Sequence, residues 1–185
     1  MKVWEMKAIL YNSETFQLSD FENDYNTYFK DKFKSNASLV DTWGNISVET
    51  IDEGEKNDCV HFWGESGVYV FSERAKKVLK SKDVELLPLI HKNTGDIYYA
   101  VHVVNILDAV DYNKSLFDKL STGLIIGFKK IYFKPDILTD VDIFMTYLNQ
   151  NVYATSVYVS DQFRNTVLES DLKGFKFDEV WDSES

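Results

Sequence analysis

The chain has 185 residues, of which 44% are hydrophobic and 15% are aromatic, and its formal net charge is −10. Because it holds only eight glycines and two prolines, its composition excludes disordered, collagen-like and low-complexity classes. Its length is that of one folding unit, so we predict a single domain over residues 1–185. The negative charge disfavours nucleic-acid binding and favours a basic partner, although surface acid also serves solubility alone.

The cysteine content and the apolar pattern bear on where the protein works. Cys59 is the only cysteine, so no intramolecular disulfide can form, which is typical of a reducing compartment. The first residues form no apolar run of signal-peptide length, and no stretch reaches the roughly eighteen apolar residues of a membrane span. We therefore expect a cytoplasmic protein without a membrane partner.

The N-terminal third of the chain predicts short elements joined by turns. Lys2–Tyr11 alternates weakly and predicts a strand. Phe21–Phe33 carries aromatic residues at helical spacing and predicts a short helix. Leu39–Ile51 predicts strand character broken by a bend at Gly44–Asn45, and the charged stretch Asp52–Asp58 predicts an exposed loop.

Two later stretches follow one plan, in which a short apolar run leads to a serine, a helix and a second apolar run. Ser72 and Ser160 are each followed by an acid, as expected of a capping hydroxyl at a helix N-terminus. The first helix is predicted to extend to about Lys80. The second carries Phe163, and Gly174 lies where a left-handed helix stop is expected.

The clearest supersecondary prediction is a hairpin between the two serine-capped helices. Its strands are Val84–Lys92 and Ile97–Asn105, joined by a turn at Asn93–Asp96. A four-residue turn would place Leu87 opposite His102 and His91 opposite Tyr98, so these four residues would share one face. The other face would carry Leu86, Ile90, Tyr99 and Val101. Both faces are largely apolar, which predicts a central pair covered on both sides.

The C-terminal half adds further strands. Asp108–Leu120 is polar and predicts a loop or a short helix, and Gly123–Lys134 returns to strand character. Further strands are predicted around Ile143–Tyr147, Val152–Val159 and Phe175–Trp181. The sum is an α+β fold of mostly antiparallel strands with two Ser-capped helices.

Several patterns resemble catalytic or metal-binding motifs but fail on detail. Gly123–Lys129 is no phosphate-binding loop, because its glycine spacing is one residue short and no Ser or Thr follows the lysine. Cys59 and His61 would share a strand face, where an imidazole could activate the thiol, but a lone cysteine is more often a buried apolar residue. His91 and His102 lie too far apart along the predicted hairpin to share zinc, so we expect no metal or cofactor.

Paired carboxylates support an alternative function, a small hydrolase. The pairs are Asp108 with Asp111, Asp140 with Asp142, and Asp178 with Glu179. Among thirty acids such pairs arise by chance, and solvated faces account for most of them. Helix capping explains Ser72 and Ser160, which lie outside a Gly-x-Ser-x-Gly motif. A third alternative is a peptide-binding adaptor with several partners of modest affinity.

An ordered series of short motifs runs from Asp41 to Trp181. The motifs are Phe71-Ser72-Glu73-Arg74-Ala75, Glu85-Leu86-Leu87-Pro88, Tyr98-Tyr99 with Asn105, Asp111 with Ser115, Ile143-Phe144, Val159-Ser160-Asp161 with Phe163, and Gly174-Phe175-Lys176-Phe177 leading to Val180-Trp181. The series resembles a family of bacterial immunity proteins found beside toxin genes in polymorphic toxin systems. Residues 1–40 depart from the family pattern.

The resemblance implies a cytoplasmic antidote that binds a cognate toxin and blocks it, without catalytic residues of its own. It carries over no toxin-binding positions, because the matching residues are caps, turns and core positions. From the charge we hypothesise that an acidic cluster meets a basic toxin face. The candidate partner-binding residues are Asp52, Glu53, Glu55 and Asp58 in the charged loop, and Asp178, Glu179 and Asp182 near the C-terminus.

Overall fold

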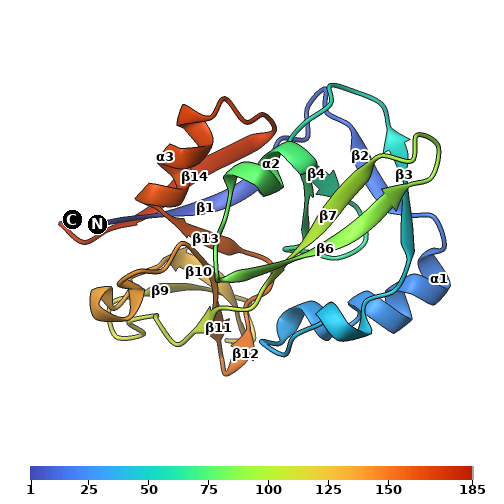
Figure 1. Cartoon of the computed structure of the whole chain (residues 1–185). Coiled ribbons are helices and arrows are strands. Elements are labelled where there is room, and N and C mark those ends of the chain that lie inside the picture. Colours follow the sequence, from blue (N-terminus) through green and yellow to red (C-terminus); the bar gives the residue numbers. More distant parts are fainter. Residues whose placement is uncertain (185) are drawn as a thin grey trace.

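A closed six-stranded barrel forms one half of the protein, and an open sheet forms the other half (Figure 1). The computed structural model describes residues 1–184. Around the barrel, each strand pairs with the next in the order β2 (Thr15–Leu18), β3 (Ile46–Asp52), β6 (Val84–His91), β7 (Ile97–Val103), β5 (Tyr69–Ser72) and β4 (Cys59–Phe62). β4 also pairs with β2, so the barrel has no free edge.

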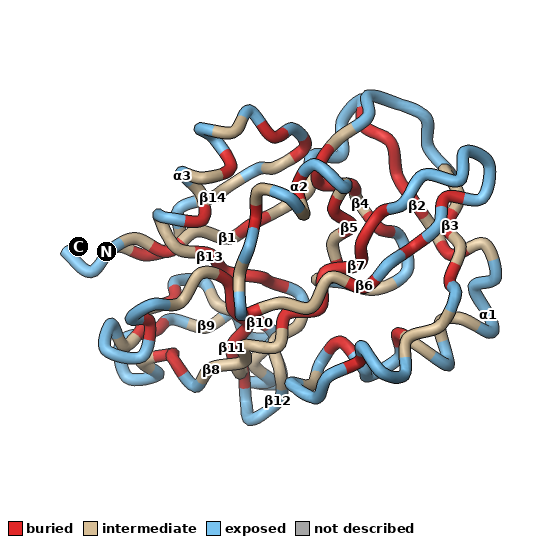
Figure 2. Tube along the Cα trace, viewed as in Figure 1, coloured by how far each residue is buried: buried red, intermediate tan, exposed pale blue. Residues whose placement is uncertain are grey.

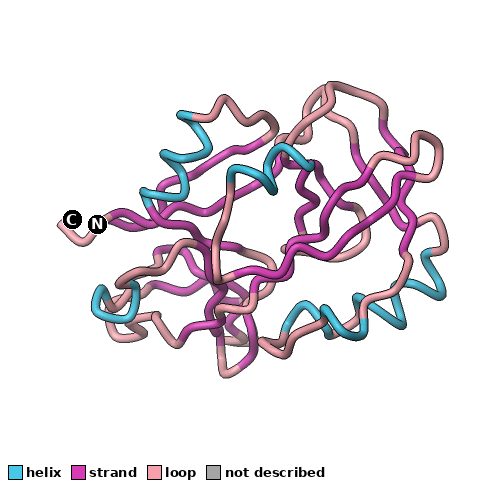
Figure 3. Tube along the Cα trace, viewed as in Figure 1, coloured by secondary structure: helices cyan, strands magenta, loops and turns pink. Residues whose placement is uncertain are grey.

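The open sheet brings the two ends of the chain together. Its strands lie in the order β12 (Asn151–Val152), β11 (Ile143–Leu148), β13 (Val157–Ser160), β1 (Lys2–Ala8) and β14 (Phe175–Asp182). A short strand, β8 (Ile106–Leu107), pairs with β11 in parallel. A separate hairpin consists of β9 (Leu116–Lys119) and β10 (Ile125–Lys130). Strands dominate the structure and helices are few (Figure 3), in agreement with the predicted α+β class.

The predicted hairpin is confirmed as β6 and β7, but its register is shifted by two residues. Leu87 pairs with Ala100 instead of His102, because Lys92 leaves the strand and joins the turn. Gly95 takes a left-handed φ of 75° in this turn. A shift of two residues keeps every side chain on its predicted face, since the side-chain period of a strand is two.

Three apolar cores follow from the alternation of the strands. The barrel is filled by side chains that include Phe16, Leu18, Phe29, Ile46, Leu87 and Leu89. A second core joins the outside of the barrel to the open sheet, and it includes Met6, Cys59, Phe71, Val101, Ile143, Val157 and Phe163. A third core, with Val3, Phe133, Phe144, Tyr158 and Trp181, covers the far face of the sheet. Buried segments therefore run through both halves (Figure 2).

The two regular helices begin at the serines that the sequence singles out. The Ser72 hydroxyl accepts the Ala75 N–H at 3.1 Å and starts α2 (Glu73–Val78). The Ser160 hydroxyl accepts the Phe163 N–H at 3.2 Å and starts α3 (Asp161–Glu169). No helix in residues 1–184 has the length and apolar character needed to cross a bilayer.

The aromatic N-terminal segment is helical, as its spacing predicts. It consists of α1 (Phe21–Asp24), a π-helical turn (Tyr25–Phe29) and a 3₁₀ turn (Lys32–Lys34). Phe29 and Phe33 stack with ring centroids 5.0 Å apart and belong to the barrel core. This segment thus supplies part of the barrel's own filling.

Four local predictions are wrong. The first half of Leu39–Ile51 contains a 3₁₀ turn (Val40–Thr42), and the strand begins only at Ile46. The predicted loop Asp108–Leu120 contains β9, because pairing with β10 overrides its polar composition. Val152–Val159 is divided between β12 and β13 by a turn. Helix α3 stops before Gly174, with Asp171 in the left-handed conformation.

Asp58 also contradicts the predicted exposed loop, because it is only 7% exposed and ties the two halves together. One carboxylate oxygen accepts the Ser72 hydroxyl at 2.7 Å. The other accepts the Lys173 N–H at 2.9 Å and the Arg74 guanidinium at 3.1 Å. Arg74 also donates to the carbonyls of Ser170 and Asp171 after α3. A single carboxylate therefore links the barrel, α2 and the turn that leads into β14.

A second carboxylate, the half-buried Glu85, fixes the aromatic segment to the barrel. Glu85 Oε2 accepts the Leu39 N–H at 2.9 Å and lies 3.0 Å from His102 Nδ1. The other ring nitrogen of His102 lies 2.8 Å from the Ser35 carbonyl oxygen. Burial raises the pKa of Glu85, but the hydrogen bonds from Leu39, Ser38 and His102 together outweigh burial and lower this pKa below its usual value.

Replacing Asp58 tests the link between the two halves. We expect Asp58→Ala to lower the free energy of unfolding by about 3 kcal/mol, because the Lys173 N–H and the Ser72 hydroxyl lose a buried charged acceptor. Chemical denaturation measures the change, and the exposed Asp52→Ala is the matched control, expected to shift stability by less than about 0.5 kcal/mol. If the two variants lowered the free energy of unfolding equally, Asp58 would not be the link between the two halves.

Acid should weaken the Glu85 contact. The folded pKa of Glu85 lies below the usual 4.5, so its stabilising contribution is present above that value and is lost as the pH falls through the folded pKa. We expect Glu85→Gln to be less stable than the wild type at neutral pH by about 1–2 kcal/mol. Urea denaturation across the acid range should show this difference shrinking below pH 4.5. A difference that grows in acid would refute it.

Candidate protein-binding surface

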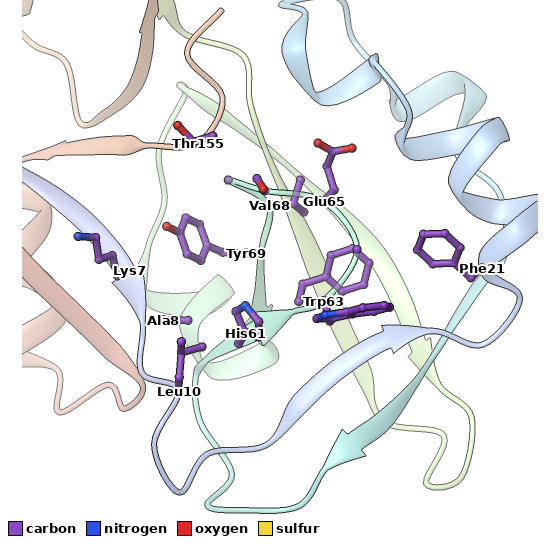
Figure 4. A pocket seen from close by; sticks show the side chains of 14 residues that line it. Lys7, Ala8, Leu10, Phe21, His61, Trp63, Glu65, Val68, Tyr69 and Thr155 are labelled. Atoms are coloured by element: carbon purple, nitrogen blue, oxygen red, sulfur yellow. The ribbon is translucent and has the colours of Figure 1, made fainter. Parts of the chain in front are cut away.

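An apolar groove lies at the seam between the barrel and the open sheet (Figure 4). It has a volume of about 570 Å³. Lys7 and Thr155 line it from the open-sheet half, and the segment from His61 to Tyr69 lines it from the barrel. Its wall positions therefore depend on how the two halves are held together.

Trp63 is the largest side chain that the groove presents to solvent, and it is 57% exposed. Trp63 directly follows β4, and its backbone N–H donates to the Phe16 carbonyl at 2.7 Å. Trp63 and Phe21 lie side by side at one end of the groove, with ring centroids 6.4 Å apart (Figure 4). Phe21 in turn stacks on Tyr25 at 5.0 Å. The aromatic surface is therefore held by neighbouring rings before any partner arrives.

The segment that follows β1 extends this apolar surface. Ile9, Leu10 and Tyr11 are exposed, and Leu10 lines the groove. Large side chains exposed together on one surface are typical of protein interaction sites. We call the groove and residues 9–11 together the apolar surface.

The charged loop Asp52–Asp58, which we call the acidic loop, borders the apolar surface. The Glu55 N–H donates to the Asn12 carbonyl, and the Glu14 N–H donates to the Glu55 carbonyl. Asp52 and His61 both lie opposite Thr15, on the two strands that flank β2, and His61 lines the groove. Three exposed acids, Asp52, Glu53 and Glu55, thus lie beside an apolar patch, and Asp58 lies beneath the surface.

The C-terminal acids have cationic neighbours. Glu179 pairs with Lys2 at 2.7 Å, and Asp178 pairs with Lys7 at 3.0 Å. Asp182 lies 3.6 Å from the Lys2 ammonium. Hydrogen bonding to Lys7 is the main reason why the pKa of Asp178 is lowered. The chain end beyond Asp182 lies away from the acidic loop (Figure 1), whereas Asp178 contacts Lys7, which lines the groove.

One predicted carboxylate pair, Asp108 with Asp111, and the lone cysteine occupy structural positions, whereas the pair Asp140 and Asp142 lines a separate pocket of about 550 Å³. Asp108 pairs with Lys134, and Asp111 accepts the N–H groups of Asn113 and Lys114 in a turn. Cys59 is buried in the core between the halves, and burial raises the pKa of its thiol. Within residues 1–184, no group of three or more His, Cys, Asp or Glu side chains is arranged to hold a metal ion.

Sequence reasoning missed the apolar surface. Trp63 lies in a brief apolar run that predicts a buried segment, and periodicity alone cannot tell an exposed tryptophan from a core one. The sequence feature that could have indicated an exposed Trp63 is Gly64, the residue directly after it. Gly64 has a φ of 143°, and a Cβ at that position would lie 3.0 Å from the Phe21 ring. Glycine there lets two aromatic side chains approach across a turn.

Comparison with known protein families identifies an immunity protein family. The model of the immunity protein family Imm11 matches residues 26–182. The match includes residues 26–40, which sequence analysis set apart and which contain Phe29 and Phe33 of the barrel core. No curated protein matches the chain.

The thiol of Cys59 should be inert in the folded protein. Burial favours the neutral thiol, and the thiolate is the form that reacts with disulfide reagents. We expect no reaction with Ellman's reagent under native conditions and one thiol per chain after denaturation, measured by absorbance. Rapid labelling of the native protein would instead indicate an accessible, activated thiol.

Proposed function

We propose, because the chain belongs to the Imm11 immunity protein family, that it binds a cognate bacterial toxin and neutralises it by stoichiometric contact, without catalysis of its own. In this proposal the chain acts in the cytoplasm as one domain over residues 1–185. The family match supports the toxin-neutralising role. The geometry of the surface suggests where contact occurs.

The apolar surface is the best-supported place for the toxin to bind, and exposed Trp63 is the observation that carries this assignment. Interfaces concentrate binding energy in a few aromatic side chains surrounded by a polar rim. Trp63 and Phe21 supply the aromatic centre, and the acidic loop supplies the rim. A groove between packed sheets is also pre-organised, so little conformational entropy is lost on binding.

Charge supports a basic toxin face opposite the acidic loop. The protein carries a net charge of −10, and Asp52, Glu53 and Glu55 are exposed. Opposite charge accelerates association at low ionic strength. We place Asp178, Glu179 and Asp182 second, because neighbouring lysines already offset their charge. We do not propose Asp58 as a toxin contact, because its carboxylate is buried and accepts hydrogen bonds within the chain.

The alternative, a hydrolase that uses a carboxylate pair, has weaker support. Asp108 and Asp111 are engaged by a lysine and by turn amides, and Asp178 and Glu179 face lysines. The remaining pair, Asp140 and Asp142, lines a pocket. An immunity-family match adds weight to binding and none to turnover. An assay for toxin inhibition at a one-to-one ratio separates the two proposals, since an enzyme would act below stoichiometry.

Removing the Trp63 ring should weaken toxin binding. We expect Trp63→Ala to raise the dissociation constant for the toxin encoded by the neighbouring gene about thirtyfold, as for a central aromatic contact. Isothermal titration calorimetry with a catalytically inactive toxin measures this, and growth of cells expressing active toxin measures protection. We expect Glu53→Lys to slow association and to reduce its salt dependence.

Leu124→Ala is the matched control for Trp63→Ala. Leu124 is 59% exposed beside the β9–β10 hairpin, so the variant also removes an exposed apolar side chain. Its affinity should equal that of the wild type. If Leu124→Ala abolished binding while Trp63→Ala did not, the interface would lie on the hairpin and the assignment to the groove would be refuted.

A further inference from the structure

A second pocket, of about 220 Å³, opens at one end of the barrel, next to the β6–β7 turn. A single water occupies about 30 Å³ in the liquid, so this pocket has room for a side chain. We call it the barrel-mouth pocket. Its titratable wall residues are Glu14, Glu53, Lys56, His91, Asp96 and Tyr98.

Glu14 is the unusual member of this set. It is only 6% exposed, and its Oε1 atom has no hydrogen-bond partner within the described structure. Burial raises the pKa of Glu14, and the nearby charges of Glu53 and Asp96 raise it further. The positive charge of Lys56 and the backbone N–H of Asn57 act in the opposite direction. A buried carboxylate oxygen without a partner is costly, and such groups mark places where a ligand completes the hydrogen bonding.

The other walls leave a negative pocket with an aromatic side. Three carboxylates face a single ammonium, that of Lys56, which makes no ion pair with any described residue. The His91 ring is fully engaged, with Nε2 3.0 Å from the Thr50 hydroxyl and Nδ1 3.2 Å from the Thr94 hydroxyl. Burial raises the pKa of Tyr98 to about 12, so its hydroxyl stays neutral at physiological pH.

We propose that the barrel-mouth pocket receives a lysine side chain of the toxin, whose ammonium pairs with the Glu14 carboxylate. Lysine suits the site because a single ammonium on a narrow alkyl chain fits a pocket of about 220 Å³ and can supply the contact that the Glu14 Oε1 atom lacks.

The pocket adjoins the surface already assigned to the toxin. Glu53 belongs to both the acidic loop and the pocket wall, and the Glu14 N–H donates to the Glu55 carbonyl at 3.2 Å. A partner seated on the apolar surface and the acidic loop would therefore have the barrel mouth within its footprint. This inference rests on the proposed function and adds the chemistry of one anchoring side chain.

The first test compares Glu14→Gln with the wild type. Glutamine has nearly the same size but carries no charge, so we expect the free variant to melt at the same or a higher temperature. We expect its affinity for the inactive toxin to fall about thirtyfold or more, as when a buried charge pair loses one partner. If Glu14 served the fold alone, Glu14→Gln would lower the melting temperature and would leave the affinity for the toxin unchanged.

The second test does not need the toxin. n-Butylammonium mimics a lysine side chain, and n-butanol is the uncharged control. In a ¹⁵N–¹H NMR titration of the wild-type protein we expect the amide signals of Thr94, Asp96 and Tyr98 to shift with n-butylammonium and not with n-butanol. Glu14→Gln should abolish the shifts.

The outcomes separate this inference from the proposed function. If Trp63→Ala weakens toxin binding and Glu14→Gln leaves it unchanged, the toxin-binding role stands and the lysine anchor is overturned. If the toxin does not bind the wild-type protein, the proposed function fails, and the n-butylammonium titration alone decides whether the pocket prefers an ammonium. Equal shifts with n-butanol, or none with either probe, would overturn the inference.

Discussion

The carboxylate of Asp58 is the contact on which the arrangement of the two halves depends. It accepts from α2, from the turn after α3 and from Arg74, so it stands where the barrel meets the open sheet. The apolar groove is formed by that meeting, with walls contributed by both halves. A buried charge with several donors is stable only in one geometry, because each lost donor leaves an uncompensated group. The same contact that stabilises the fold therefore sets the width of the binding surface.

The structure separates two kinds of acid among those that are buried or half-buried. Asp58 and Glu85 have their donors within the chain and hold segments together. Glu14 retains an unpartnered oxygen at the barrel mouth, where an outside cation can supply the missing contact. Net negative charge attracts a basic partner at long range, but the local environment of each acid decides whether it serves the fold or the interface.

Sequence patterns predicted the features that depend on neighbouring residues along the chain. The faces of the β6–β7 hairpin, the helical aromatic segment and the last strand are local consequences of periodicity. The hairpin register depended on whether Lys92 belongs to the strand or the turn, which periodicity does not determine. The burial of Asp58 and the exposure of Trp63 depend on contacts between distant segments, so the charged loop and the groove could not be predicted from composition.

Strand β1 lies between β13 and β14, so its partners, residues 157–160 and 175–182, lie far from it along the sequence. Closing so large a loop is slow relative to local pairing, and the ribosome must release residues 157–182 before the open sheet can form. A nascent chain therefore offers no finished groove. The open-sheet wall of the groove, which includes Lys7 and Thr155, is therefore a late product of folding.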